Sequence, residues 1–509
     1  MAGIGRGEPP PALQPPAASS ATPPAGAQEP ACRRGSPQRP RWGAYPPNPP
    51  PSLERWAAAY TSKEVTYRFR GRSYSFALSR GLFSSNDIDR GSSLLLDALS
   101  RVLDAGDAAL PASGPLSVLD AGSGVGVLGV CAAGALSYPA APGGASRALR
   151  VRAQDRDELA RLFTEYNARR NGLGPEILEA HTEPLLGGPE GARWDLILSN
   201  LPAKAGSAVL EDFVFRAPAL LGEGGMALVV AVAPLGDFLA GRMAAARCGV
   251  FLDEGGAGYR VLGFRPAGGP GPEGRQGTVR RGPGFFGDYP AYLRGGGDYE
   301  LSGLRYHLDA TEGAAGFDNP GAAVRAAVRL WVKLKALKKT GKSFAGGATG
   351  ALLVHEPDQG HFPVWLARSM DGGAKPRFVL SGRNVLALEA AAWNLRKAAG
   401  LAAATVPAAD PETGLEALLR EGPYAGAVLF PDTVPGTDRI AAHWEALGRL
   451  LEPGGLALAA LPSSQAERFA RQKPRNFSAL GDLRREGFRA LAFRLNSAPP
   501  PGQAGRQNP

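Results

Sequence analysis

Two kinds of hydrophobic spacing alternate along this chain. From Thr66 to Phe76 apolar and polar residues alternate around a Gly-Arg turn, which predicts a β-hairpin. Apolar runs typical of buried strands follow at 116–119 and 194–199, and a strand ending in an acid is predicted at 149–155. A stretch with helical spacing, 157–170, lies between them. Strands that alternate with helices predict an α/β fold around a mostly parallel sheet.

The hydrophobic pattern occurs twice. The hairpin of the first half recurs with its marker residues at one constant spacing: Tyr67, Gly71, Tyr74 and Gly81 correspond to Tyr299, Gly303, Tyr306 and Gly313. The register continues to the ends of both halves, where 220–228 corresponds to 450–458. A repeat of this length predicts two tandem copies of one fold, and duplicated copies should share one strand order.

Shifts in composition predict the domain boundaries. Segments rich in Pro, Ala, Gly and Ser with few large apolar residues cannot offset the entropy of ordering, so they are expected to be tails or linkers. We predict a disordered tail at 1–52, a catalytic domain at 53–266, a Gly/Pro-rich linker at 267–297, a degenerate second domain at 298–498 and a second tail at 499–509.

Composition narrows the class of protein further. With 44% hydrophobic residues and no long uninterrupted apolar segment, a globular protein without a membrane span is expected. The three cysteines have no ligand or disulfide spacing, so we expect a reducing cytoplasm and no metal site. The excess of 57 Lys and Arg over 47 Asp and Glu favours a polyanionic partner, with simple solubility as the alternative.

A glycine-rich loop follows the first predicted buried strand. The strand runs into Asp120, Gly122, Gly124 and Gly126, and an apolar helical stretch comes next. Strand, glycine loop and helix form the order of a nucleotide-binding crossover, in which glycines let the backbone approach a ligand closely. The acid at Asp120 suits the cationic methionine moiety of S-adenosylmethionine better than a pyrophosphate, so this cofactor is predicted.

Two further acids stand at the ends of predicted strands. Asp155 ends the second strand, where a carboxylate can accept both ribose hydroxyls. Glu183 ends the third strand and is a candidate acceptor for the adenine amino group, although an ordinary surface acid would look the same.

Asn200, Leu201 and Pro202 follow another buried strand. The segment resembles the (N/D)-P-P-(aromatic) motif of methyltransferases that modify exocyclic or amide nitrogens. The resemblance implies that the Asn200 side-chain oxygen and the Leu201 carbonyl accept hydrogen bonds from the target amino group. Leu201 replaces the first proline of the motif, and Ala203 replaces the aromatic residue that stacks on a flipped base.

Other segments narrow the resemblance. Residues 67–76, 81–84, 89–96, 200–206 and 258–262 are similar to the small-domain group of ribosomal RNA guanine-N2 methyltransferases, which includes the C-type enzyme of the small subunit. The resemblance spans about residues 64–265. It implies two tandem Rossmann-like class I methyltransferase domains, an S-adenosylmethionine cofactor, and ribosomal RNA or the small ribosomal subunit as partner.

The second half is expected to lack the site. Aligning the halves places His355–His361, with its proline and bulky residues, over the glycine loop. Gly382 falls where Asp155 stands in the first half, and Pro431 falls where Asn200 stands. The apolar strands persist, so the fold should survive without a cofactor pocket.

Basic residues recur every four positions near the start of the second half. Arg325, Arg329 and Lys333 form this stripe, which could track RNA phosphates or could simply be a solvated helix face.

The resemblance therefore implies transfer of a methyl group from S-adenosylmethionine to the exocyclic amino group of a guanine in ribosomal RNA. Two alternatives remain open: a protein glutamine amide or adenine N6 as acceptor, or a non-catalytic protein that binds RNA during ribosome assembly.

Overall fold

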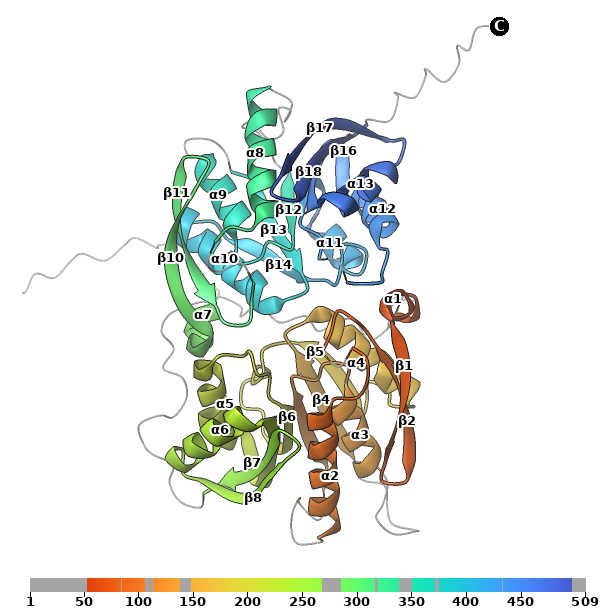
Figure 1. The fold of residues 1–509 in the computed structure, drawn as a ribbon, viewed down its shortest axis with the longest axis vertical. Helices are drawn as coiled ribbons and strands as arrows, with labels where there is room; N and C mark the ends of the chain where they lie inside the picture. Colours follow the sequence, from red (N-terminus) through yellow and green to blue (C-terminus); the bar gives the residue numbers. More distant parts are fainter. Residues whose placement is uncertain are drawn as a thin grey trace, which may run out of the picture. The chain divides into compact units, whose positions relative to one another are not determined.

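The computed structural model describes residues 53–83, 85–105, 110, 114–137, 148–267, 285–315, 319–337, 350–370, 375–432 and 434–496. Both predicted tails, 1–52 and 499–509, lie outside these residues. Within the described residues the chain forms two seven-stranded sheets and two separate hairpins (Figure 1). No described helix has both the length and the hydropathy needed to span a bilayer.

The sheet of the first half has the strand order β5-β4-β3-β6-β7-β9-β8. Its strands are β3 (Leu116–Ala121), β4 (Leu149–Asp155), β5 (Leu178–Thr182), β6 (Trp194–Asn200), β7 (Leu221–Val232), β8 (Cys248–Gly256) and β9 (Tyr259–Pro266). Strand β9 runs antiparallel to both of its neighbours, and the other pairs are parallel.

Helices cover both faces of this sheet because the central strands are apolar on both sides. In β3, Val118 packs into one core and Leu119 into the other. The first core holds α1 (Leu53–Tyr60), α2 (Arg90–Asp104), α3 (Val127–Leu136) and α4 (Glu158–Arg170), and the second holds α5 (Ser207–Leu220) and α6 (Ala233–Ala245).

The predicted hairpin packs beside this sheet. It consists of β1 (Lys63–Phe69) and β2 (Arg72–Leu78), with Tyr67 opposite Tyr74. Asn167 of α4 ties the hairpin to the sheet: its Oδ1 accepts from the Ala77 amide at 2.8 Å, and its Nδ2 donates to the carbonyls of Ala77 and Val125 at 3.1 and 2.8 Å.

The second half repeats this plan. Its sheet has the order β14-β13-β12-β15-β16-β18-β17, and its hairpin places Tyr299 opposite Tyr306. The strands are β10 (Leu293–Leu301), β11 (Leu304–Thr311), β12 (Ala351–His355), β13 (Arg377–Gly382), β14 (Ala403–Pro407), β15 (Tyr424–Leu429), β16 (Leu451–Pro462), β17 (Phe477–Arg485) and β18 (Phe488–Leu495).

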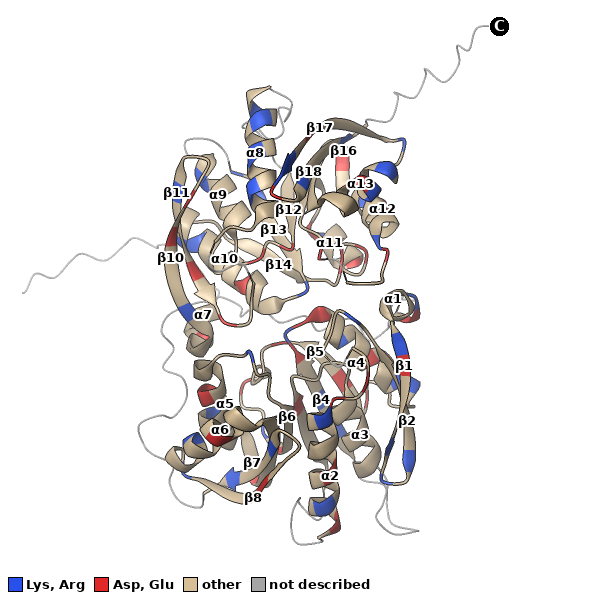
Figure 2. Cartoon of the chain, in the orientation of Figure 1, with Lys and Arg blue, Asp and Glu red and all other residues tan. Residues whose placement is uncertain are grey.

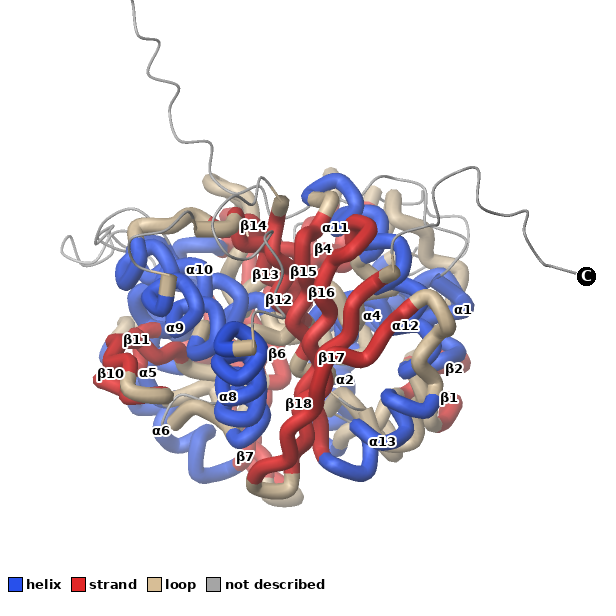
Figure 3. The backbone as a smooth tube through the Cα atoms, turned by 90° about the horizontal axis from the view of Figure 1, so that it is seen from above, coloured by secondary structure: helices blue, strands red, loops and turns tan. Residues whose placement is uncertain are grey.

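Two groups of helices cover the second sheet, and Figure 3 shows its strands running between them. One group contains α8 (Ala322–Ala336), α9 (His361–Ser369) and α10 (Val385–Ala399). The other contains α11 (Leu415–Glu421), α12 (Ile440–Leu450) and α13 (Ser463–Arg471). The predicted fold class, two tandem Rossmann-like α/β domains, is confirmed.

The two halves also share side-chain detail. Asn394 of α10 accepts from the Asp309 amide at 2.8 Å and donates to the carbonyls of Asp309 and Gln359, both at 2.9 Å. These are the bonds that Asn167 makes in the first half. The common strand order and this matched asparagine support the duplication that we infer from the sequence.

The predicted linker differs from expectation at its end. Residues 268–284 lie outside the described part of the chain, but the segment from Phe285 forms α7 (Phe285–Asp288), the 3-10 helix η1 (Pro290–Tyr292) and the beginning of β10. Phe285, Phe286 and Tyr292 are buried in the core beneath α5 and α6. The ring of Phe286 lies 5.5 Å from that of Trp393 in α10, so aromatic residues order this segment against both halves.

The described residues of both halves belong to one compact unit, and the two halves contact each other where α4 and α10 begin. Asp157 and Asn384 cap these helices and pair in an antiparallel bridge. On either side of the bridge, the Glu158 amide donates to the Arg383 carbonyl and the Val385 amide donates to the Arg156 carbonyl, each at 2.9 Å. Equivalent backbone positions of the two halves therefore bond to each other.

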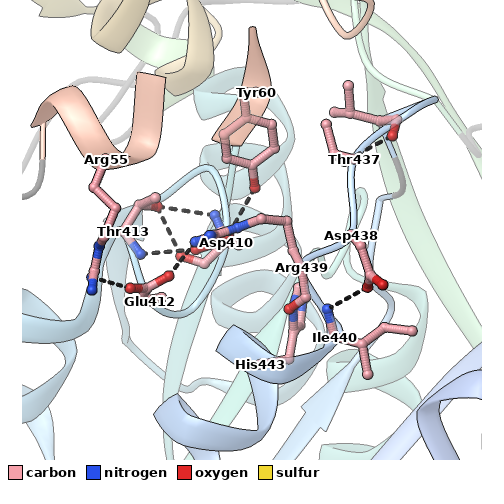
Figure 4. Close-up of polar contacts among 11 residues, drawn as sticks. Arg55, Tyr60, Asp410, Glu412, Thr413, Thr437, Asp438, Arg439, Ile440 and His443 are labelled. Atoms are coloured by element: carbon pink, nitrogen blue, oxygen red, sulfur yellow. Dashed lines mark hydrogen bonds and ion pairs between the residues drawn. The ribbon is translucent and has the colours of Figure 1, made fainter. Parts of the chain in front are cut away.

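Helix α1 makes a second contact with the other half (Figure 4). Tyr60 donates from its hydroxyl to Asp410 Oδ2 at 2.7 Å, and Arg55 pairs with Glu412. Arg439 donates from Nε to the same Asp410 oxygen at 2.7 Å. Burial would raise the pKa of Asp410, but the charge of Arg439 lowers it to about 2, so the carboxylate stays ionised.

Arg383 binds residues from three segments of the chain, two in the first half and one in its own half. Its guanidinium lies 2.6 Å from Asp157 Oδ2 and 2.9 Å from Asp432 Oδ2, and it donates to the Gly81 carbonyl at 2.9 Å. The residue is 6% exposed. Removing a buried guanidinium that binds two carboxylates and a carbonyl lowers stability, because the carboxylates lose their counter-charge and the carbonyl loses its hydrogen-bond donor.

We predict that Arg383→Met lowers the free energy of unfolding by about 2 kcal/mol, between the values typical of exposed and of fully buried pairs. Arg377→Met is the matched control, because Arg377 pairs with Glu421 at the surface and its loss should cost less than about 1 kcal/mol. Urea denaturation of both variants provides the measurement. Equal effects would contradict a special contribution of Arg383.

Candidate active site

The candidate residues meet at one edge of the first sheet. Strands β3 and β6 are neighbours at the point where the strand order reverses, and their carboxyl ends open onto the same edge. Ligands of open α/β sheets bind at this position. The glycine loop follows β3 at Ala121, and Asn200 is the last residue of β6, so the topology brings them together.

The glycine loop has the backbone that the sequence predicts. Gly122, Gly124 and Gly126 have φ angles of 81°, 58° and 88°, a region that favours glycine. The Gly122 amide donates to the Gln154 carbonyl at 2.8 Å, which ties the loop to β4. Gly126 is the N-terminal cap of α3, so the loop delivers the start of a helix to the sheet edge.

Asp120 lies directly beneath this loop and is fully buried. Its Oδ2 accepts from the Gly129 amide at 2.8 Å, while its Oδ1 is buried with no hydrogen-bond partner among the described residues. Burial raises the pKa of Asp120 to about 7. A buried acceptor without a partner fits the ammonium group of a methionine moiety, which would supply both a donor and a counter-charge.

Asp155 lies against the same loop. Its Oδ2 accepts from the Gly124 amide and its Oδ1 accepts from the Asp157 amide, both at 3.0 Å. Burial, and next the nearby Asp157 carboxylate, raise the pKa of Asp155. The structure thus brings Asp155 to the glycine loop, where an acceptor for ribose hydroxyls is predicted.

Glu183, the predicted acceptor for the adenine amino group, pairs with an arginine. Its carboxylate is buried and its Oε2 lies 2.8 Å from Arg152 Nη2, so it already has a cationic partner. Burial raises the pKa of Glu183, and Arg152 opposes this shift. A role for Glu183 toward adenine stays a prediction.

Asn200 is half-buried and is held by residues that the sequence analysis did not assign to the site. Its Nδ2 donates to Asp89 Oδ2 at 2.8 Å and to Ser92 Oγ at 3.1 Å. Tyr259 donates from its hydroxyl to Asp89 Oδ1 at 3.2 Å. Asp89 caps α2, and an aspartate before an apolar helical stretch was the available signal for the cap. Its contact with Asn200 depends on tertiary structure.

The two departures from the methyltransferase motif have different structural consequences. Leu201 is buried in the core of α5 and α6, and its amide donates to the Val230 carbonyl at 2.9 Å, so its side chain anchors the segment by packing. Pro202 and Ala203 are exposed. The segment after Asn200 therefore reaches solvent at the sheet edge.

The predicted basic stripe lies apart from these residues, on α8 of the second half (Figure 2). Arg329 and Lys333 are exposed, and Arg325 pairs with Glu486.

The second half keeps the shape of the glycine loop but fills it with side chains. Glu356, Asp358 and Gly360 have φ angles of 55°, 51° and 102°, which repeats the pattern of Gly122, Gly124 and Gly126. Glu356 turns toward Gly382, the position of Asp155 in the first half, and its Oε1 accepts from the Arg383 amide at 2.8 Å. Burial raises the pKa of Glu356 to about 8.

A cavity of about 690 Å³ lies at the opposite edge of the first sheet. Leu116, Leu149 and Glu176 are among its lining residues, at the amino ends of β3 and β4. It is therefore separate from Asn200. Among the described residues, no three His, Cys, Asp or Glu side chains are grouped as metal ligands.

Comparisons with known proteins agree with this geometry. Residues 73–243 match the family model of the methyltransferase small domain. None of the curated proteins matches the sequence. Two solved structures are among those to which the chain is similar. A 16S rRNA guanine-N2 methyltransferase (RsmC) from T. thermophilus, in complex with AdoMet and guanosine, is 17% identical, with a TM-score of 0.52 over 86% of this chain and 99% of that one. A ribosomal protein L11 methylase from Lactobacillus delbrueckii subsp. bulgaricus is 21% identical, with a TM-score of 0.28 over 37% of this chain and 82% of that one.

The family match and the sheet topology support an S-adenosylmethionine-dependent methyltransferase domain in the first half. More particularly, the segment that matches the methyltransferase small domain, residues 73–243, contains the glycine loop, Asp155 and Asn200.

We predict that Asp120→Asn changes the pH dependence of stability. The unfolded chain releases the Asp120 proton near pH 3.8 and the folded, cofactor-free chain near pH 7, so this residue makes folding less favourable as pH rises between these values. The amide cannot ionise. The Tm of Asp120→Asn should therefore exceed that of the unchanged protein by a margin that grows from about pH 4 to pH 7, while calorimetry shows weaker S-adenosylmethionine binding. A constant margin would contradict the raised pKa.

Proposed function

We propose that this protein transfers the methyl group of S-adenosylmethionine to the exocyclic N2 amino group of a guanine in ribosomal RNA. The observation that carries the proposal is the position of Asn200 at the carboxyl end of β6, beside the glycine loop, with its amide nitrogen bonded to Asp89 and Ser92. Because the nitrogen donates to these residues, Oδ1 is the end of the carboxamide that can receive a substrate amino group.

The residues of the chain contribute mainly by positioning. S-adenosylmethionine, when bound, supplies a methyl group on a sulfonium sulfur, which is already electrophilic. Asn200 Oδ1 and the Leu201 carbonyl would each accept one N–H of the guanine amino group, so that the lone pair of the nitrogen is directed toward the methyl. Correct orientation of this kind lowers the barrier without an additional catalytic base, and the proton that the methylated nitrogen loses would pass to solvent. Asp120 and Asp155 would bind the cofactor.

Two observations support guanine as the methyl acceptor. Residues 64–265 resemble the ribosomal RNA guanine-N2 group, and the fold similarity to the T. thermophilus enzyme extends over both halves. A glutamine amide or an adenine N6 also presents an amino group to an Asn-x-Pro segment. Methylation of purified small ribosomal subunits, compared with a release factor and with adenine-containing RNA, separates these acceptors.

RNA binding is proposed for α8. Arg329 and Lys333 are exposed one helical turn apart, and the chain carries a net charge of +10. Cations at this spacing can contact successive phosphates and release counterions from RNA.

We predict that Asn200→Ala reduces kcat for methyl transfer to small-subunit RNA about 100-fold, because the amino group loses its orienting acceptor. Binding of S-adenosylmethionine should change less than about 2-fold, because Asp120 and Asp155 are unaltered. Radiolabelled methyl transfer and calorimetry give the two values, and Asn476→Ala, at an exposed position of the second half, is the control. Unchanged kcat in Asn200→Ala would refute the proposed role.

We predict that charge reversal of Arg325, Arg329 and Lys333 to Glu weakens RNA binding about 10-fold or more and reduces its dependence on salt. The control is reversal of Arg420, Arg449 and Arg471, which are also exposed in the second half and give the same net charge. Equal losses in both triple variants would show that only overall charge matters.

A further inference from the structure

The amide nitrogen of Asn200 makes two hydrogen bonds. It donates to Asp89 Oδ2 at 2.8 Å and to Ser92 Oγ at 3.1 Å. A carboxamide whose nitrogen donates twice on one side presents its oxygen on the other side. The network therefore determines which end of Asn200 a substrate meets.

Asp89 is itself held in place from two directions. Its Oδ2 also accepts from the Ser92 amide at 3.2 Å, as the N-terminal cap of α2, and its Oδ1 accepts from the Tyr259 hydroxyl at 3.2 Å. Three elements, α2, β6 and β9, thus contribute to one set of bonds. A carboxylate restrained by a helix cap and a tyrosine can fix the rotamer of its asparagine partner.

The second half shows that the fold does not need this network. Helix α8 begins after Gly321 where α2 begins after Asp89, and β18 begins at Phe488 where β9 begins at Tyr259. The strand registers correct the sequence alignment by one residue: Leu196 pairs with Val118 and Met226 as Gly426 pairs with Leu352 and Leu456, so Phe430, not Pro431, stands at the position of Asn200. Val324 stands at the position of Ser92. All four polar groups are replaced together, yet the sheet has the same strand order. The network is therefore associated with the site and is dispensable for the architecture.

We propose that Asp89 is a positioning residue, which holds the Asn200 carboxamide with Oδ1 toward the acceptor amino group and which makes asparagine, rather than aspartate, the residue required at position 200. The inference rests on the proposed function. An aspartate at position 200 would place a second carboxylate within 2.8 Å of Asp89, where like charges repel each other. Because Asp89 is negatively charged, this site requires asparagine rather than aspartate at the first position of the (N/D)-P-P motif.

The first test separates positioning from helix capping. Serine caps helices as well as aspartate does, but its side chain is shorter and cannot reach the Asn200 nitrogen. Asp89→Ser should keep the Tm close to that of the unchanged protein, lower kcat about 10- to 100-fold and leave the KM for S-adenosylmethionine within about 2-fold. Asp438→Ser is the matched control, because Asp438 accepts from the Ile440 amide at the start of α12, and it should leave kcat unchanged.

The second test is rescue by exchange of the pair. Asn200→Asp should lose activity through repulsion, and Asp89→Asn should lose it because its amide no longer imposes one orientation on Asn200. The double variant restores a donor facing a carboxylate, with the two residues exchanged. We expect the double variant to be at least about 10-fold more active than the weaker single variant. A double variant no more active than that single variant would overturn the inference.

Denaturation without substrate distinguishes this inference from the proposed function. The urea midpoints of the two single variants and the double variant show whether positions 89 and 200 are coupled, whatever the acceptor is. Coupled midpoints with rescued activity support the inference, and additive midpoints overturn it. Coupled midpoints combined with full guanine methylation by Asn200→Ala would overturn the proposed function, and with it the positioning role.

Discussion

A carboxamide has one end that accepts hydrogen bonds and one that donates them, and Asn200 can orient an amino group only if its donating end is bonded elsewhere. Asp89 and Ser92 both accept from the amide nitrogen, and in the proposed function the oxygen receives the substrate amino group. The rest of the first half serves this arrangement. The neighbouring strands β3 and β6 bring the glycine loop and Asn200 to one edge, and α2 brings the aspartate that restrains the asparagine.

The second half shows what remains when this constraint is lost. It keeps the strand order, the asparagine that ties hairpin to sheet, and even the left-handed backbone of the glycine loop. Glu356 occupies the side of the loop that faces Gly382, and Phe430, at the position of Asn200, has no side-chain amide. Through Arg383 this half contacts Asp157, whose amide donates to Asp155, the residue proposed to bind the cofactor ribose.

The fold was largely predictable because apolar strands, glycine turns and the repeat are local signals. The glycine loop, Asp155 and Asn200 were predictable for the same reason, since each follows directly from a strand end. The partners of Asn200 were not, because Asp89 and Tyr259 are distant in sequence and meet it only through the packing of α2 and β9. For Glu183, the sequence predicts the position after a strand, but it does not predict the ion pair with Arg152. The end of the predicted linker forms helices because Phe285, Phe286 and Tyr292 are buried between the halves. The prediction of a linker relied on glycine and proline content, which carries no information about this burial.

The central claim is tested most directly by an experimental structure of the protein with S-adenosylhomocysteine and guanosine. The account predicts the guanine N2 atom within about 3.2 Å of Asn200 Oδ1, with the Asn200 nitrogen still bonded to Asp89. A guanine amino group bound elsewhere, or an Asn200 whose nitrogen faces the ligand, would contradict it.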